Sequence, residues 1–340
     1  MAAHELHDVA RSIVADHRGI LAADESTGTI KKRFDSIGVE STEESRRAYR
    51  NLLFTAAGAE EFIGGVILYD ETIRQSADDG TPFAELLASK GVVPGIKVDT
   101  GAKPLALHPG ETVTEGLDGL RERCVEYREL GARFAKWRAV ITIGDGIPTD
   151  ACLHTNAHAL ARYAAICQET GLVPIVEPEV LMDADNTIEA CYDVTARTLH
   201  ALYEELYRQD VDLPGTLLKP NMVIAGKGSP EQADAARIAE LTVQCFLEHV
   251  PAAVPGIVFL SGGQTEVQAT ENLDAISRRG GPWPLSFSYG RALQASALRA
   301  WGGEAANVET AQAAYLHRAR MNAQAAAGEW SADLEEAVAA

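Results

Sequence analysis

One lysine stands alone in an apolar stretch of the chain. Lys219 lies between Leu217-Leu218 and Met222-Val223, whose residue types predict a buried strand. The chain has 8 lysines against 22 arginines, so lysine is not used to fill the surface. Burial favours the uncharged amine, which is a nucleophile. Lys219 is therefore a candidate for covalent chemistry. The alternative is a lysine that pairs with a carboxylate and only holds the structure together.

Charged side chains also stand near the ends of other predicted strands. They are Asp24, Lys97, Asp99, Lys136, Arg138, Glu177 and Glu179. Those two residues apart on one strand share a face, because strand side chains alternate. Any one pair could be a structural ion pair. Buried ion pairs often fail to recover their desolvation cost, so charge converging from several strands favours a catalytic site.

Two later strands end in glycines and hydroxyls. Ser261-Gly262-Gly263 and Ser288-Tyr289-Gly290-Arg291 place exposed backbone N–H groups and one arginine at neighbouring strand ends. Glycine permits close backbone approach, and N–H groups at a helix start bind anions. Either segment alone is consistent with a plain turn. Together they predict a phosphate site.

The sequence offers no set of metal ligands. His154 and His158 have a two-ligand spacing but lack the glutamate of the H-E-x-x-H pattern, so solvated histidines near a helix start are expected. The 5 cysteines are scattered without a CxxC pair, which is typical of reduced thiols rather than a disulfide framework. We expect no catalytic metal.

The elements that must position these residues alternate along the chain. Short apolar runs occur at residues 19–24, 62–69, 92–99, 134–140, 172–179, 215–223, 256–263 and 284–290. Amphipathic helical segments lie between them, one opening with Ser41 and Glu44 in the spacing of a capping box. Eight such alternations predict a single-domain α/β protein, a (β/α)8 TIM barrel. A doubly wound sheet is the rival, but no G-x-G-x-x-G follows the first strand.

The two ends of the chain carry additional predictions. Extra helices are expected at about residues 4–17 and 308–327, and the barrel domain at residues 1–328. Residues 329–340 are predicted to form a flexible tail, because those from about 331 onward are small or acidic. The N-terminus lacks the features of a signal peptide, and no apolar run is long enough for a membrane helix.

The formal net charge of −19 argues against nucleic-acid or anionic-membrane partners, which require a basic surface. An anionic ligand would therefore need positive charge concentrated at its own site. The expected location is the cytoplasm.

Taken together, these segments make the chain resemble the class I (Schiff-base) fructose-bisphosphate aldolases from about residue 10 to 328. The resemblance rests on residues 19–28 (GILAADESTG), 95–99 (GIKVD), 134–138 (FAKWR), 175–179 (IVEPE), 215–222 (GTLLKPNM), 259–264 (FLSGGQ) and 286–294 (SFSYGRALQ). It implies reversible, metal-independent cleavage of fructose 1,6-bisphosphate into dihydroxyacetone phosphate and glyceraldehyde 3-phosphate, in glycolysis and gluconeogenesis. No cofactor is implied. Homo-oligomers, commonly tetramers, are typical of the family.

The resemblance also implies roles for individual residues. Lys219 matches the Schiff-base lysine and Glu177 the general acid/base, while Asp24, Lys136 and Glu179 match residues around the reacting carbons. The residues that match the site for the ketose C1 phosphate are Ser261, Gly262, Gly263, Ser288, Gly290 and Arg291. Those that match residues near the other phosphate are Arg33, Lys97, Ser26 and Arg138.

An imine at Lys219 would supply the electron sink that carbon–carbon cleavage beside a ketone requires. Either Asp24 or Glu177 is a candidate to remove the C4 hydroxyl proton, and like-charge repulsion by Lys136 would assist the amine. The chain departs from eukaryotic members in lacking a terminal tyrosine, since its last tyrosine is Tyr315. Another residue would then exchange the enamine proton, or that step would be slower.

Three alternatives remain from the sequence. The first is an imine-forming barrel enzyme that prefers fructose 1-phosphate or sedoheptulose bisphosphate. The second is a metal-dependent aldolase, for which the sequence offers no ligand set. The third is a non-catalytic scaffold that binds sugar phosphates.

Overall fold

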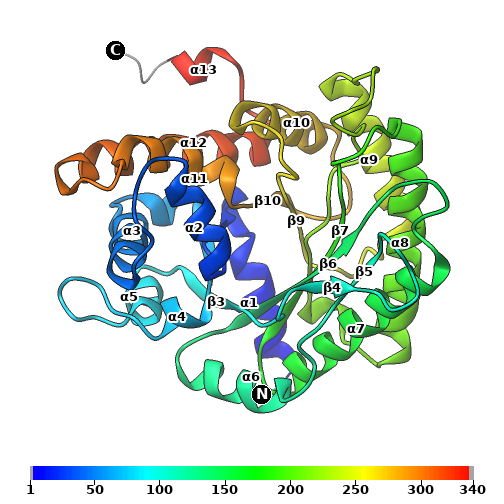
Figure 1. The fold of residues 1–340 in the computed structure, drawn as a ribbon, viewed down its shortest axis with the longest axis horizontal. Coiled ribbons are helices and arrows are strands. Elements are labelled where there is room, and N and C mark those ends of the chain that lie inside the picture. The colour runs from blue at the N-terminus through cyan, green and yellow to red at the C-terminus, as the bar shows by residue number, and fades with distance from the viewer. Residues whose placement is uncertain (1–2, 337–340) are drawn as a thin grey trace.

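The computed structural model describes residues 3–336, and eight parallel strands close into a barrel (Figure 1). The order around the barrel is β1-β10-β9-β8-β7-β6-β3-β2, and β2 pairs with β1 to close it. The barrel strands are β1 (Gly19–Ala22), β2 (Ile63–Leu68), β3 (Val93–Lys97), β6 (Phe134–Ile141), β7 (Val173–Val180), β8 (Leu217–Leu218), β9 (Ile257–Phe259) and β10 (Leu285–Tyr289). The predicted (β/α)8 TIM barrel is confirmed.

The helices surround these strands (Figure 1). They are α1 (Ala3–Ile13), α2 (Thr27–Asp35), α3 (Glu43–Thr55), α4 (Asp70–Ile73), α5 (Phe83–Ser89), α6 (Leu120–Glu129), α7 (Asp150–Glu169), α8 (Ile188–Arg208), α9 (Ala235–His249), α10 (Glu266–Arg279), α11 (Arg291–Trp301), α12 (Val308–Ala327) and α13 (Asp333–Glu336). Both predicted terminal helices are present. The first is α1, which ends at Ile13 and is followed by a short 3-10 turn at Ala15–His17, and the second is α12.

The capping box of α3 lies one residue later than the sequence predicted. Thr42, not Ser41, is the N-cap: Ser45 N–H donates to Thr42 Oγ1 at 3.0 Å, and Thr42 N–H donates to Ser45 Oγ at 2.9 Å. The hydroxyl of Ser45 therefore takes the role expected for the Glu44 carboxylate, with the whole capping box moved by one residue.

Helix α1 closes the end of the barrel opposite the strand C-termini. Ile13 and other apolar side chains of α1 and the turn after it pack against interior residues such as Phe134 and Ile175. A Cβ at Gly64 would lie 2.1 Å from the carbonyl oxygen of Ile13, so glycine is required for this contact. The barrel interior is therefore a sealed apolar core at this end.

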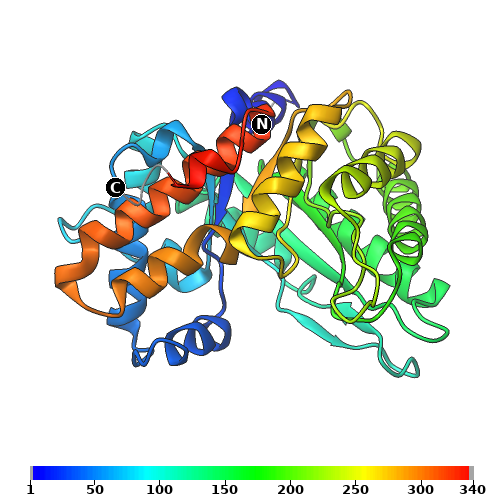
Figure 2. The ribbon, with the colours of Figure 1, turned by 90° about the horizontal axis from the view of Figure 1, so that it is seen from above.

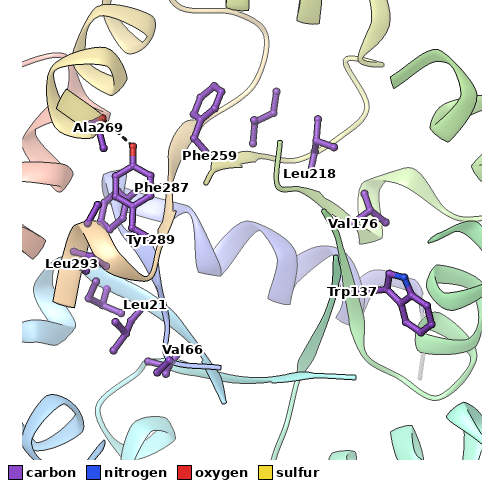
Figure 3. Close-up of a cluster of buried hydrophobic side chains, with 14 of the residues drawn as sticks. Leu21, Val66, Trp137, Val176, Leu218, Phe259, Ala269, Phe287, Tyr289 and Leu293 are labelled. Carbon is purple, nitrogen blue, oxygen red and sulfur yellow. Dashed lines mark hydrogen bonds between the residues drawn. The ribbon is translucent and has the colours of Figure 1, made fainter. Parts of the chain in front are cut away.

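A second apolar layer fills the space between the strands and the outer helices (Figure 3). Trp137, Leu218 and Phe259 point outward from their strands into it. Tyr289 is fully buried there and donates its hydroxyl to the carbonyl of Ala269 at 3.0 Å. Alternate residues of these strands are left to face the barrel interior, where the polar residues lie.

Two features of the strands differ from the sequence prediction. The sixth barrel strand is only Leu217–Leu218, because Gly215 ends a 3-10 turn and Pro220 has no N–H to continue the ladder. Lys219 therefore follows the strand, although its N–H still donates to the Val176 carbonyl at 2.8 Å. In addition, an unpredicted antiparallel hairpin, β4 (Ala102–Pro104) with β5 (Thr112–Thr114), lies outside the barrel order.

Helix α12 lies across the outside of the barrel beside α11 (Figure 2). Beyond it, Trp330 is buried, its N–H donates to Asp274 Oδ1 at 3.0 Å, and its indole N–H donates to Glu335 at 3.0 Å. Glu335 also pairs with Arg318 of α12. Residues 329–336 are thus held against the barrel. Residues 337–340 of the predicted flexible tail lie outside the described residues, and the domain boundary at 328 stays a prediction.

Candidate active site

A pocket of about 270 Å³ opens at the C-terminal ends of the strands. Every predicted site residue except Gly263 lines it. Its lining is Ala22, Asp24, Glu25, Ser26, Thr29, Arg33, Lys97, Lys136, Arg138, Glu177, Glu179, Lys219, Leu260, Ser261, Gly262, Ser288, Gly290 and Arg291. Chain segments far apart in sequence meet here because the ends of parallel barrel strands share one face.

Three buried charges and the partly buried Asp24 form the centre of the pocket. Lys219 Nζ lies 3.1 Å from Glu177 Oε1. Lys136 Nζ lies 2.7 Å from Asp24 Oδ2 and 3.3 Å from Glu177 Oε2. The Lys219 side chain is only 5% exposed, so its amine is desolvated as the sequence predicted. The repulsion expected between Lys136 and Lys219 is opposed by the two carboxylates beside Lys136.

The charges of this cluster determine their protonation. Burial would raise the pKa of Asp24 and Glu177, but the ammonium groups of Lys136 and Lys219 outweigh it and hold both below their ordinary values. Burial would lower the pKa of Lys136, yet Asp24 and Glu177 keep it above its ordinary value. Both carboxylates are therefore ionised at neutral pH and able to accept protons, and Lys136 is a fixed cation.

Charged pairs extend from this centre along β6 and β7 and at the end of β3. Arg138 of β6 forms an ion pair with Glu179 of β7, which lies two residues beyond the residue opposite Arg138 in the register, Glu177. Lys97 Nζ lies 2.5 Å from Asp99 Oδ1, and the Asp99 side chain is 2% exposed. Asp99 also accepts the N–H of Gly101 at 3.1 Å, so a fixed carboxylate holds the ammonium of Lys97 in place.

One end of the pocket has the features of an anion site. Helix α11 begins at Arg291 directly after Gly290, so its first N–H groups face the pocket end. Ser288 Oγ is buried and has no hydrogen-bond partner among residues 3–336. Buried hydroxyls are normally paired, so this atom is suited to a ligand oxygen.

The structure places Arg33 at this same end. Its Nη2 lies 3.5 Å from where a Cβ on Gly290 would be, and Arg33 and Arg291 line a neighbouring pocket that Lys97 does not reach. Lys97, Arg138 and Ser26 line a different neighbouring pocket, which Arg33 does not reach. The sequence grouped Arg33 with Lys97 near the second phosphate. The geometry groups it with Arg291 instead, because α2 carries it towards β10.

Sequence reasoning missed several residues of the site. Glu25 forms ion pairs with both Arg33 and Arg50, and Arg50 is buried. Burial would raise the pKa of Glu25, but the two guanidinium groups hold it below its ordinary value. Thr29 lines the pocket 3.1 Å from the hydroxyl of Ser26. Glu25 follows Asp24 directly, which was the available signal; no signal pointed to Arg50.

Metal-binding clusters and membrane-spanning helices are both lacking in residues 3–336. This part of the chain holds no group of three or more His, Cys, Asp or Glu side chains arranged to bind a metal ion. His154 and His158 are not simply solvated, because both rings lie near Glu205, with His158 Nδ1 2.9 Å from its carboxylate. None of the described helices has the length and apolar character needed to span a membrane.

Comparison with known proteins identifies the family. The profile described as "Glycolytic: Fructose-bisphosphate aldolase class-I" matches residues 5–340. The chain belongs to the class-I fructose-bisphosphate aldolases. It is 57% identical over 332 residues to the probable fructose-bisphosphate aldolase class 1 of Xanthomonas campestris, covering 97% of this chain and 99% of that protein.

Proteins similar to this aldolase also occur outside the bacteria. It is 54% identical to cytosolic fructose-bisphosphate aldolase 4 of Arabidopsis thaliana, covering 98% of this chain and 85% of that protein. A solved structure of Plasmodium falciparum fructose-bisphosphate aldolase, in complex with TRAP and a small-molecule inhibitor, superposes with a TM-score of 0.96 at 49% identity, covering 97% of this chain and 96% of that one. The aldolase is thus a lyase of glycolysis that cleaves fructose 1,6-bisphosphate, and the alternative substrates are not favoured.

Proposed function

We propose that Lys219 performs the cleavage by forming an imine with the ketone carbon of the sugar phosphate. The observation that carries this proposal is the 3.1 Å distance between Lys219 Nζ and Glu177 Oε1 inside the pocket. A desolvated amine beside an ionised carboxylate can lose its proton locally and attack a carbonyl. The alternative, in which Lys219 pairs with Glu177 only to hold the structure together, does not explain why both residues line a pocket.

Glu177 serves the proton transfers of imine formation. Its carboxylate takes one proton from the Lys219 ammonium, and the free amine then attacks the ketone carbon. That proton and a second one, removed from the nitrogen of the addition product, are both delivered to the former ketone oxygen, which leaves as water and gives the protonated imine. This requires a group that starts ionised, in keeping with the lowered pKa of Glu177. Lys136 keeps the carboxylate oriented through its 3.3 Å contact.

Cleavage then breaks the bond between C3 and C4 of the ketose. Removal of the C4 hydroxyl proton leaves an aldehyde on the C4 fragment, and the bonding electrons move into the protonated imine to give an enamine. Asp24 and Glu177 are both ionised, and both remain candidates for this base. Protonation of the enamine and hydrolysis release dihydroxyacetone phosphate and free Lys219. Glu179, through its pair with Arg138, positions the residues around these carbons.

The two phosphates of the substrate are assigned to the two ends of the pocket. We assign the C1 phosphate to Arg291 with Arg33, and to the backbone and hydroxyl groups of Ser261, Gly262, Gly263, Ser288 and Gly290. The C6 phosphate is assigned to Lys97, Arg138 and Ser26. Anchoring both phosphates orients the ketone for attack.

The remaining properties are proposed from the family. Schiff-base chemistry supplies its own electron sink, so we propose that no metal or other cofactor participates. Aldolases of this family are commonly homo-oligomers, often tetramers, and we propose a homo-oligomer for this chain. A cytoplasmic location is proposed because relatives at above 50% identity are cytosolic enzymes. No nucleic-acid or membrane partner is proposed.

Borohydride reduction tests the imine. Treatment with dihydroxyacetone phosphate and borohydride should add a reduced adduct to the Lys219 peptide and abolish activity, while Lys219→Arg should remain unlabelled. Peptide mass spectrometry locates the adduct. Labelling at Lys97 or Lys136 instead, or loss of activity of the untreated enzyme with EDTA, would contradict the proposal.

A further inference from the structure

A lysine outside the predicted site reaches the C1-phosphate end from a neighbouring loop. The loop after β8 is fixed to the loop after β7 by three backbone hydrogen bonds. Lys227 N–H donates to the Met182 carbonyl at 2.8 Å, Gly226 N–H to Asn186 at 2.9 Å, and Gly228 N–H to Ala184 at 2.9 Å. Lys227 therefore projects from a rigid backbone.

The ammonium of Lys227 lies over the glycine turn after β9. A Cβ at Gly263 would lie 2.6 Å from Lys227 Nζ and 3.1 Å from Arg291 Nη2. The two cations thus converge on one point beside a backbone that has φ +95° and tolerates only glycine. Loops after three successive strands and the start of α11 meet at this position.

The charges at this point are not balanced within the protein. Lys227 Nζ pairs with Asp183 at 2.6 Å, but both side chains are about half exposed, at 44% and 61%. Arg291 has no carboxylate partner within residues 3–336. Two adjacent cations repel one another, and an anion bound between them relieves that repulsion. A half-exposed ion pair is weak enough to be replaced by a dianionic phosphate.

We propose that Lys227 binds the C1 phosphate directly, together with Arg291 and the backbone N–H groups of Gly262 and Gly263. This inference rests on the proposed function. The distribution of lysine supports it: three of the 8 lysines, Lys97, Lys136 and Lys219, line the pocket, and Lys227 lies close to Arg291, which also lines it. In a chain of net charge −19, this clustering supplies the local positive potential that a sugar phosphate requires.

The test compares dihydroxyacetone phosphate with dihydroxyacetone, which forms the same imine but has no phosphate. Borohydride trapping at Lys219 is measured against ligand concentration. Lys227→Met should raise the half-saturating concentration of dihydroxyacetone phosphate at least threefold and leave that of dihydroxyacetone unchanged. Lys31→Met is the matched control, because Lys31 is an exposed lysine paired with Asp35 at 2.8 Å, and should change neither. A smaller change in Lys227→Met, or an equal change for both ligands, overturns the inference.

Two further variants separate binding from a structural tie. Lys227→Arg should retain most of the affinity. Asp183→Asn breaks the ion pair but keeps the cation, so it should bind dihydroxyacetone phosphate at least as well as the unmodified protein. If Asp183→Asn reproduces the loss of Lys227→Met, Lys227 only ties the loops and the inference is wrong. Failure of Lys219 to be trapped in the unmodified protein would instead reject the proposed function.

Discussion

Lys219 Nζ lies 3.1 Å from Glu177 Oε1, while the other oxygen of Glu177 lies 3.3 Å from Lys136 Nζ. One carboxylate is therefore shared between the proposed nucleophile and a lysine that is fixed by Asp24. A proton can leave Lys219 without leaving the cluster, because Glu177 is beside it. Asp24 holds Lys136 independently, so Glu177 stays free to exchange that proton.

Neutralising Glu177 should stop imine formation without removing the amine. We expect Glu177→Gln to lower the rate of borohydride trapping with dihydroxyacetone phosphate by about 100-fold or more, the usual scale of a lost general base. Glu204→Gln, which alters an exposed carboxylate on α8, is the control and should behave as the unmodified enzyme. Undiminished trapping in Glu177→Gln would transfer the role to another group.

The two ends of the pocket should differ in the substrates they affect. Arg291→Ala and Arg33→Ala should each lower kcat/KM, by an amount that corresponds to about 2–4 kcal/mol of lost transition-state binding. The loss should be the same for fructose 1,6-bisphosphate and for fructose 1-phosphate, because both substrates carry the C1 phosphate. Lys97→Ala should penalise only the bisphosphate to that extent. Arg121→Ala, at an exposed pair with Glu169, serves as the control. If Arg33→Ala behaves as Lys97→Ala does, Arg33 belongs to the second phosphate.

The buried pair of Arg50 and Glu25 should matter for stability. Arg50 Nη2 lies 2.5 Å from Glu25 Oε2. Arg50→Met removes one of the two guanidinium groups that pair with the buried carboxylate of Glu25. The free energy of unfolding in urea should fall by about 3 kcal/mol. Adding Glu25→Gln to Arg50→Met should not restore this loss, because it leaves Arg33 without its carboxylate partner. A double variant more stable than Arg50→Met would contradict this account of the charge balance.

Stability should also depend on pH through Asp24. Its pKa is lower in the folded than in the unfolded protein, so it contributes stability that is present above about pH 4 and is lost as pH falls through the folded value. Urea midpoints measured between pH 5 and pH 2.5 should fall more steeply in the unmodified protein than in Asp24→Asn. Parallel curves would show that Asp24 is not the group responsible.

The end of the chain can be divided by truncation. Removal of residues 337–340 should leave cleavage and tritium exchange from dihydroxyacetone phosphate nearly unchanged, because this tail carries no tyrosine. Removal from residue 329 should lower the thermal midpoint, since it deletes the buried Trp330 and the Glu335 pair with Arg318. A tenfold fall in exchange with the shorter cut, about 1.4 kcal/mol, would mean that the tail participates.

The sequence predicted the features that depend on local pattern. Each of the eight apolar runs coincides with a barrel strand, although β6 and β7 extend one residue beyond their runs, because runs of this length bounded by turn residues are a local signal. Lys219 and Glu177 were predicted on the same principle, as charged residues among apolar neighbours. Even Pro178, a poor strand residue, lies within β7, where the surrounding barrel overrides its propensity.

What escaped prediction depends on three-dimensional placement. Arg33 and Lys97 have equivalent charges, and only the path of α2 separates them in the pocket. Lys227 lies in a glycine-containing loop whose sequence is typical of an exposed turn. Only the backbone hydrogen bonds of this loop to residues 182–186 bring Lys227 close to Gly263. Arg50 lies on an amphipathic helix, where an arginine is expected to face solvent.

The closure of the barrel by α1 has a consequence for the order of events in a catalytic cycle. The apolar seal around Ile13 leaves the Lys219 amine reachable only from the strand C-termini. Substrate, water and both products must therefore pass through the same opening, at the C-terminal ends of the strands. We expect the aldehyde fragment, while it is bound, to lie between the enamine and this opening. Departure of the aldehyde must then precede protonation from outside, so the three-carbon carbanion equivalent persists long enough to be captured by a different aldehyde.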